Sequence, residues 1–385
     1  MASNTNLNSC RRDIMLGLKE TGYSPFGFIK AVNTNTGAEV AARGDVIKVP
    51  IGKAGTMIDT PVGFNFPSEA GSDVNSINME LQYAKTVPID WNGEDQKSMM
   101  NSGAWGTVRA QQFADAFNQI RDEIEKTCAL EAIKNASRAY GTAGTAPFAS
   151  GSSMADMAQM KGILDTNKAP AAGRSIVLSS EAETSLLTNQ TNMIKVNEAG
   201  SDVMIRQGII MPTYGFNVRS SAQLAEHTAG EGTGYVTNLA ASLAAGATEI
   251  AVDTGSGSVL AGDVVTFQGD TNKYVITSNN DTTTTKVTIG EPGLRKALAD
   301  GKTMTIGSAY TPSIALHKSA IALAIRPPKA PEEGDMMDRT YVTDPYTGIV
   351  YEVALVKGQR VVQYQVSAVW GVKAVNPAWI ALLLG

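Results

Sequence analysis

Four side chains in the sequence could hold a metal ion or activate a nucleophile: His227, His317, Cys10 and Cys128. Zinc needs clustered imidazole and thiolate ligands, and no two of these residues lie at ligand spacing. A serine or cysteine nucleophile usually needs a histidine base, but neither histidine stands beside a nucleophile motif. His317 lies in an apolar run and is interpreted as structural. The sequence therefore predicts no metal site and no cofactor.

The residues from 296 to 303 read Lys-Ala-Leu-Ala-Asp-Gly-Lys-Thr and end like a phosphate-binding loop. Such a loop begins with a glycine, which lets the backbone wrap the phosphate. Lys296 stands in the place of that glycine. We therefore interpret these residues as a turn.

A third stretch, residues 252–257, reads Val-Asp-Thr-Gly-Ser-Gly and resembles the active-site turn of aspartic proteases. In that chemistry two facing carboxylates share a proton, so one activates water while the other stays protonated. A single copy centred on Asp253 would need a symmetric dimer to supply the second carboxylate. The same residue types also commonly form a turn between two strands. Asp263, further along the chain, likewise has a structural interpretation, as the entrance of a strand.

The composition is that of a folded chain with little affinity for nucleic acid. The chain has 385 residues, of which 43% are hydrophobic, and a net charge of -5. Its basic residues are spread among acidic ones, so counterion release cannot drive tight DNA binding. Two distant cysteines exclude a disulfide scaffold and favour a reducing compartment. We find no signal-peptide core and no apolar run near the roughly 18 residues of a membrane span.

An extended two-stranded loop is predicted to follow a short N-terminal helix. Residues 46–52 and 77–91 bracket a polar tip rich in glycine and proline. In the second segment, apolar residues alternate with polar ones at the period of a strand: Ile77, Met79, Leu81 and Tyr83. An isolated hairpin is marginal in water. We therefore expect these four side chains to be buried on a neighbouring copy, as candidates for an assembly interface.

A long helix is predicted over residues 104–140, ended by Gly141. Its apolar residues recur three or four positions apart: Phe113, Phe117, Ile120, Ile124 and Cys128. We interpret this stripe as core or subunit contact, and its two phenylalanines as further candidates for the assembly interface.

The same helix carries charged residues between the members of the stripe, among them Arg121 and Glu125. We interpret these charges as a solvated face. Leu130 and Ile133 leave the stripe for another face of the helix. The helix is therefore expected to contact different partners along its length.

A mixed α/β region follows, in which an inserted module is predicted. Helix, strand, helix and strand are expected at residues 153–165, 174–180, 180–189 and 214–221. Residues 225–311 alternate short β runs with turn clusters, which indicates a small separate barrel or sandwich. Two long strands joined by a tight turn at residues 357–359 close the chain. This set of elements is unusual for an enzyme but natural for a lattice subunit, whose arms and loops bury their apolar faces on neighbours.

In this order of elements the sequence resembles the major capsid (coat) proteins of tailed bacteriophages, whose fold is shared with the floor of the herpesvirus capsid. Residues 248–269 and 164–187 are similar to the podovirus-type coat proteins with an inserted β domain, and residues 344–379 resemble the closing strands of the family. The resemblance implies an α+β tailed-phage capsid fold with an inserted small β-barrel domain.

The resemblance also implies a division of the chain. The expected segments are an N-terminal arm (1–42), an extended β loop (43–91), a peripheral domain with a long spine helix (92–151), the first part of an axial domain (152–224), the inserted β domain (225–311), the last part of the axial domain (312–335) and the closing peripheral strands (336–385).

The implied function is structural and not enzymatic. Copies of the chain would form the pentamers and hexamers of an icosahedral shell around double-stranded DNA, without sequence-specific DNA binding and without a membrane. Scaffolding, portal and decoration proteins are the implied partners, with assembly in the host bacterial cytoplasm and a final place in the virion capsid. Two alternatives stay open: an aspartic-type protease dimer that uses Asp253, and a non-viral compartment shell protein of the same fold.

Overall fold

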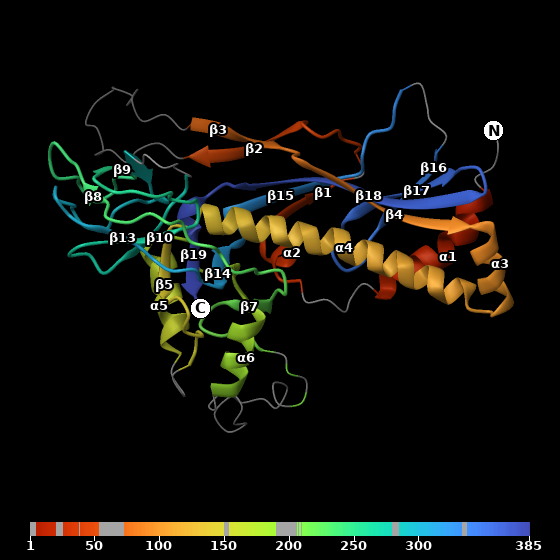
Figure 1. Ribbon diagram of the computed structural model, residues 1–385, viewed down its shortest axis with the longest axis horizontal. Helices are drawn as coiled ribbons and strands as arrows, with labels where there is room; N and C mark the ends of the chain where they lie inside the picture. Colours follow the sequence, from red (N-terminus) through yellow and green to blue (C-terminus); the bar gives the residue numbers. More distant parts are fainter. Residues whose placement is uncertain are drawn as a thin grey trace, which may run out of the picture.

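Helices and sheets are mixed in an elongated body, so the predicted α+β class is confirmed (Figure 1). The computed structural model describes residues 5–20, 26–37, 39–53, 73–149, 154–189, 206, 208, 210–278, 285–332 and 337–385. Among these residues, no helix is long and apolar enough to cross a membrane.

The long helix α4 (Trp105–Lys134) crosses the body obliquely (Figure 1). Its 30 residues span roughly 45 Å. The predicted apolar stripe is confirmed, because every member from Phe113 to Cys128 is buried. The predicted end at Gly141 is wrong. The helix ends at Lys134 because Ser137 hydrogen-bonds to the carbonyl of Ile380, with the backbone N–H at 2.9 Å, and draws the chain into the strand β5 (Arg138–Gly141).

One sheet of six strands lies along α4. Its strands, in spatial order, are β1 (Asn33–Thr36), β15 (Ile321–Arg326), β18 (Val361–Ala374), β17 (Val350–Lys357) and β16 (Met337–Thr343), and β4 (Tyr83–Asn92) also pairs with β18. The predicted pair of closing strands is therefore confirmed as β17 and β18. The N-terminal helix α1 (Thr5–Glu20) packs against α4, with Ile14 and Leu18 buried, and the short helices α2 (Phe28–Ala31) and α3 (Gly93–Asn101) flank it.

A second sheet, of eight strands, forms the other part of the body. In spatial order its strands are β13 (Met304–Ile306), β10 (Val264–Phe267), β11 (Lys273–Val275), β5, β19 (Ile380–Leu384), β14 (Pro312–His317), β6 (Arg174–Leu178) and β7 (Asn217–Ser220). The helices α5 (Ala155–Thr166) and α6 (Ser180–Asn189) pack on it through Met157, Met160 and Leu186. The predicted helix–strand–helix–strand order is confirmed. Because β14 and β15 lie in different sheets, residues 312–335 contribute to both.

The inserted module, residues 225–311, has a core of its own but does not stand apart. A three-stranded sheet of β12 (Lys286–Thr288), β9 (Glu249–Asp253) and β8 (Val236–Thr237) packs across this core from β10 and β13. The strands β10, β11 and β13 also continue the eight-stranded sheet, because β11 pairs with β5. The module is therefore joined to the body by backbone hydrogen bonds, which periodicity within the module could not indicate.

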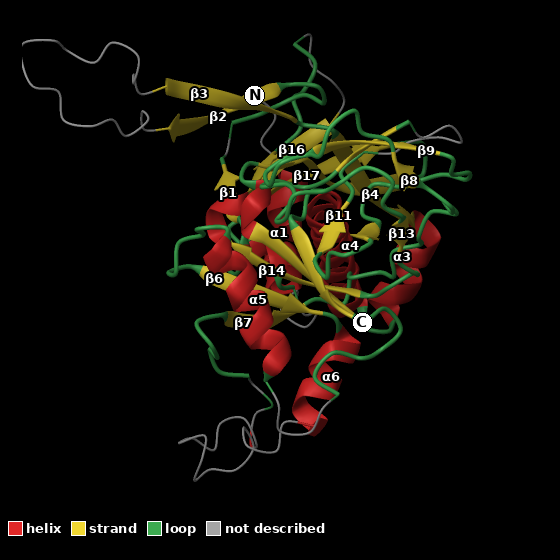
Figure 2. Ribbon diagram, turned by 90° about the vertical axis from the view of Figure 1, so that its left-hand side faces the viewer, coloured by secondary structure: helices red, strands yellow, loops and turns green. Residues whose placement is uncertain are grey.

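A two-stranded hairpin of β2 (Val46–Lys53) and β3 (Asp73–Glu80) projects from the body (Figure 2). The single strand predicted over residues 77–91 is divided at Leu81 and Gln82, because β3 pairs with β2 whereas β4 pairs with β18. Two 3-10 turns, η2 (Lys318–Ala320) and η3 (Pro377–Trp379), complete the described elements.

Candidate assembly surfaces

The projecting hairpin is amphipathic. Its strands pair in antiparallel register, with Val49 opposite Ile77 and Ile47 opposite Met79. Because side chains alternate along a strand, these residues share one face. The opposite face carries exposed polar side chains such as Lys48 and Asn78. One face of the hairpin is therefore suited to contact with an apolar surface.

The base of the hairpin is anchored within its own chain. Met79 is 1% exposed and Leu81 is fully buried, and both pack against Ala322, Ala324 and Val369 of the six-stranded sheet. The backbones approach closely here, since a Cβ added at Gly371 of β18 would lie 2.3 Å from the carbonyl oxygen of Glu80. The hairpin thus leaves the body in a fixed direction.

The predicted interface role of Met79 and Leu81 is wrong, because both side chains fill the core of their own chain. Ile77 lies one pair further out and is only half-buried, as is Ile51 on the facing strand. Tyr83 is also half-buried and stacks on Trp370, with ring centroids 5.7 Å apart. Ile77 and Tyr83 remain candidates for contact with another copy.

The two phenylalanines predicted as interface candidates are also internal. Phe113 is fully buried with its ring edge-on to Tyr364, and Phe117 is 1% exposed with its ring 4.9 Å from Tyr351. These contacts fasten α4 to β18 and β17. The interface role predicted for Phe113 and Phe117 is therefore wrong, because intrachain packing uses both rings completely.

The buried carboxylate of Glu125 organises the N-terminal segment, although its side chain is predicted from the sequence to lie in solvent. Glu125 of α4 is fully buried and accepts hydrogen bonds from the backbone N–H groups of Gly27, Phe28 and Ile29, at 3.2, 3.0 and 2.8 Å. The hydroxyl of Ser221 donates a fourth, at 3.0 Å. Burial raises the pKa of Glu125 above its usual value, although these hydrogen bonds oppose the rise. Glu125 thus fixes the start of α2 and residue 221 to the middle of the long helix.

The neighbouring Arg121 is likewise buried, with its guanidinium over the ring of Phe26 at 4.6 Å. The prediction of a solvated charged face is wrong for both residues. A signal was present in the sequence, because Arg121 and Glu125 lie at four-residue spacing in a row that includes the buried Phe113, Phe117 and Ile133. The charge of the two residues concealed their position on an inward-facing row.

A second buried carboxylate closes the base of the inserted module. Asp263 directly precedes β10, as predicted for a strand entrance, and its side chain is fully buried. It accepts hydrogen bonds from the N–H groups of Leu260, at 2.7 Å, and Gly230, and pairs with His227 Nε2 at 3.0 Å. The hydroxyl of Tyr310 donates to the carbonyl of Gly262 at 2.7 Å. Asp263 therefore fixes the segment that enters the module, at residues 227–230, to the start of β10, and the neighbouring Gly262 bonds the segment that leaves it.

The stretch that resembles a protease turn is a tight turn at the end of β9. Asp253 is the last residue of the strand, Thr254 has a φ of +57°, and the N–H of Gly255 bonds to the carbonyl of Asp253 at 2.7 Å. The hydroxyl of Tyr235 donates to the carbonyl of Gly257 at 2.6 Å. These bonds give the residues a structural use as a turn.

The remaining chemical candidates are dispersed. His317 Nε2 lies 2.9 Å from the carbonyl of Ala172, and Cys10 and Cys128 are both buried and are not joined in a disulfide. Residues 296–303 contain a turn and lead into the strand β13, whereas a phosphate-binding loop leads into a helix. Among the described residues, no group of three or more His, Cys, Asp or Glu could hold a metal ion.

The described residues thus combine a long helix, a six-stranded sheet, an eight-stranded sheet that the inserted module extends, and an anchored amphipathic hairpin. The sequence matches no protein-family model and no curated protein. Among solved structures, the chain is similar to the capsid asymmetric unit of cyanophage A-1(L), with a TM-score of 0.47, 11% identity and coverage of 96% of this chain and 92% of that chain. It is also similar to the capsid of Myoviridae phage XM1, with a TM-score of 0.46, 8% identity and coverage of 93% and 90%. A virus-like particle from Pyrococcus furiosus is similar with a TM-score of 0.44, 9% identity and coverage of 98% of both chains.

Proposed function

We propose that this chain is the structural major capsid protein of a tailed phage, and that copies of it assemble into an icosahedral shell around double-stranded DNA. The observation that carries the proposal is the hairpin of β2 and β3. Its base is locked into the subunit by Met79 and Leu81, while its apolar face continues outward to the half-buried Ile51 and Ile77. Burial of that face on another copy would remove apolar surface from water at every repeat of the contact.

The arrangement of the other elements supports the same proposal. The order of N-terminal helix, extended hairpin, long helix, second sheet with an insertion, and closing strands is the order implied by the resemblance to capsid proteins. The division into arm, extended loop, peripheral, axial and inserted domains belongs to this proposal. So do scaffolding, portal and decoration proteins as partners, assembly in the host cytoplasm, and the absence of enzymatic activity.

Electron microscopy of the purified protein, alone and with its scaffold, tests the proposal. We expect closed shells of uniform size, together with a rapidly sedimenting species in analytical ultracentrifugation. A protein that remains monomeric at every concentration, with or without scaffold, would contradict the assignment. Shells that form in a host without phage genes and that enclose protein cargo would favour the non-viral compartment instead.

The protease alternative is tested by peptide cleavage at acidic pH. An aspartic-type dimer would lose its activity in the variant Asp253→Asn, because an amide cannot act as the base. We expect no cleavage by the wild-type protein and normal shells from the variant, since Asp253 serves a turn. Acid-dependent cleavage that is lost in Asp253→Asn would support the alternative.

A further inference from the structure

A cavity of 610 Å³ lies where the body meets the inserted module. Its walls come from β5, the residues 142–149 that follow it, the helix α5, and the residues 271–273 at the start of β11. Two cationic side chains line it, Arg138 of β5 and Lys273 of β11. The cavity therefore joins two parts of the chain and presents positive charge to its interior.

Arg138 has unused hydrogen-bonding capacity although it is only 8% exposed. Its Nη1 lies 3.3 Å from Asn272 Oδ1 and its Nη2 lies 3.5 Å from the carbonyl oxygen of Ile163, both at the long end of the hydrogen-bond range. Its Nε has no hydrogen-bond partner among the described residues. A buried guanidinium normally has its donors satisfied, whereas this one has a shielded Nε without a partner and two Nη groups held only by long hydrogen bonds.

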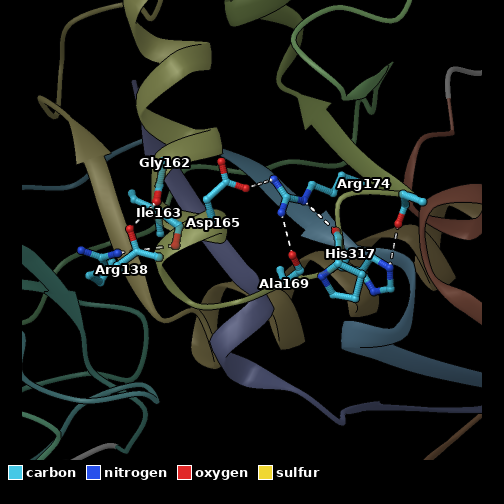
Figure 3. Close-up of polar contacts among 10 residues, drawn as sticks. Arg138, Gly162, Ile163, Asp165, Ala169, Arg174 and His317 are labelled. Atoms are coloured by element: carbon cyan, nitrogen blue, oxygen red, sulfur yellow. Dashed lines mark hydrogen bonds and ion pairs between the residues drawn. The ribbon is translucent and has the colours of Figure 1, made fainter.

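Arg174, on the other side of α5, shows what a satisfied guanidinium looks like in this fold (Figure 3). Its Nη1 pairs with Asp165 at 2.6 Å, its Nη2 donates to the carbonyl of Ala169 at 2.7 Å, and its Nε donates to the carbonyl of Pro170 at 2.8 Å. Figure 3 draws Arg138 beside Ile163 at the same end of α5. The difference between the two residues is the carboxylate, which Arg174 has and Arg138 lacks.

Arg138 has charged neighbours of both signs, but none of them forms an ion pair with it in the described residues. Burial, and then the positive charge of Arg295, lower the pKa of Arg138, whereas Tyr274 and Asp270 oppose this shift. The acid that lines the cavity, Asp156, already accepts the N–H of Phe148 at 2.7 Å. Asp270 accepts from Tyr274 and Asn272, at 2.6 Å each. Both nearby carboxylates are therefore engaged elsewhere.

We propose that this cavity binds an oxyanion of the carboxylate or phosphate class between Arg138 and Lys273. A planar guanidinium pairs with such groups through two parallel hydrogen bonds, and an ammonium adds a second charge. The oxyanion has two sources of the same chemistry, a free phosphate or an acidic side chain of a second copy. In either case the bound group bridges β5 to β11, the strand of the module that pairs with β5, and so stiffens the connection between the module and the body.

Isothermal titration calorimetry on the whole subunit tests the site with inorganic phosphate and with succinate, at constant ionic strength. We expect saturable binding of at least one anion by the wild type, about tenfold weaker binding by Lys273→Gln, and a larger loss in Arg138→Gln. The matched control is Lys286→Gln, which removes the same charge from an exposed position in the same module. It should bind like the wild type.

No saturable binding of either anion, or equal binding by the wild type and by Lys273→Gln, would overturn the proposal. Circular dichroism establishes which variants are folded. If Arg138→Gln does not fold, Lys273→Gln decides alone, because its side chain is partly exposed. A second experiment distinguishes the two sources by measuring shell assembly with and without added phosphate. If phosphate inhibits assembly of the wild type, while the control Lys286→Gln assembles normally without phosphate, the site binds the carboxylate of a neighbouring copy. If phosphate leaves assembly unaffected, the site binds the free ion.

Discussion

Replacing Glu125 by alanine should release the segment that the carboxylate holds. The variant leaves three buried N–H groups, those of residues 27–29, without their acceptor. An unsatisfied buried donor costs about 1–3 kcal/mol. Part of this cost is offset because a buried charge is removed and a water molecule can enter. We expect a net loss of about 3 kcal/mol in the local stability of this contact.

Hydrogen exchange followed by mass spectrometry measures this loss locally, in a peptide that covers residues 26–32. A loss of about 3 kcal/mol corresponds to exchange roughly 100-fold faster. The control is Glu123→Ala, two residues away on the same helix, whose side chain is 31% exposed and pairs with Lys85. The control should change exchange by less than about fivefold, because surface ion pairs contribute little. Equal acceleration by both variants would refute the role of Glu125.

The same carboxylate gives a signed pH dependence. The pKa of Glu125 is raised in the folded state, so folding favours its protonated form. Its contribution to stability is therefore present below the unfolded pKa and is lost as the pH rises through the folded pKa. Glu125→Gln cannot titrate, so the stability of the wild type relative to this variant should fall as the pH rises above the ordinary glutamate pKa of about 4.3. Urea unfolding at several pH values checks this, and a difference that grows with pH would contradict it.

Two further substitutions probe the anchors of the extended elements. Gly371→Val should displace the base of the hairpin, because the added Cβ would lie 2.3 Å from the carbonyl oxygen of Glu80. Limited proteolysis should then cut the variant near the hairpin. A variant as resistant to the protease as the wild type would contradict the close approach. Asp263→Asn should lower the local stability at the base of the inserted module by about 2–3 kcal/mol, because a buried charged acceptor is lost. Proteolysis within residues 225–311 should then be faster. An unchanged cleavage rate would count against this role of Asp263.

Periodicity predicted most of the elements that local sequence determines. The strand β2, the stripe of α4 and the pair of β17 and β18 follow from spacing alone. The end of α4 could not be predicted, because a bond from Ser137 to the carbonyl of Ile380, far along the chain, decides it. The joining of the inserted module to the body through β11 and β5 is also a long-range pairing, with no local signal.

The assembly candidates show the same limit. Alternation correctly placed Met79 and Ile77 on one face of a strand, but it could not say which part of that face the chain covers itself. Met79 meets Ala322 and Ala324, small residues that are distant in the sequence and leave room for its side chain. Ile77 lies beyond that cover. Likewise Glu125 reads as a surface charge until Gly27, Phe28 and Ile29 bring their N–H groups to it.

The central claim is that the outer apolar face of the hairpin joins one copy to the next. Sedimentation velocity of Ile77→Asp, compared with Asn78→Asp, tests it most directly, because the two variants add the same charge to opposite faces of β3 at adjacent residues. We predict that Ile77→Asp gives folded subunits that sediment as small species, whereas Asn78→Asp still forms shells. Normal shells from Ile77→Asp would contradict the claim.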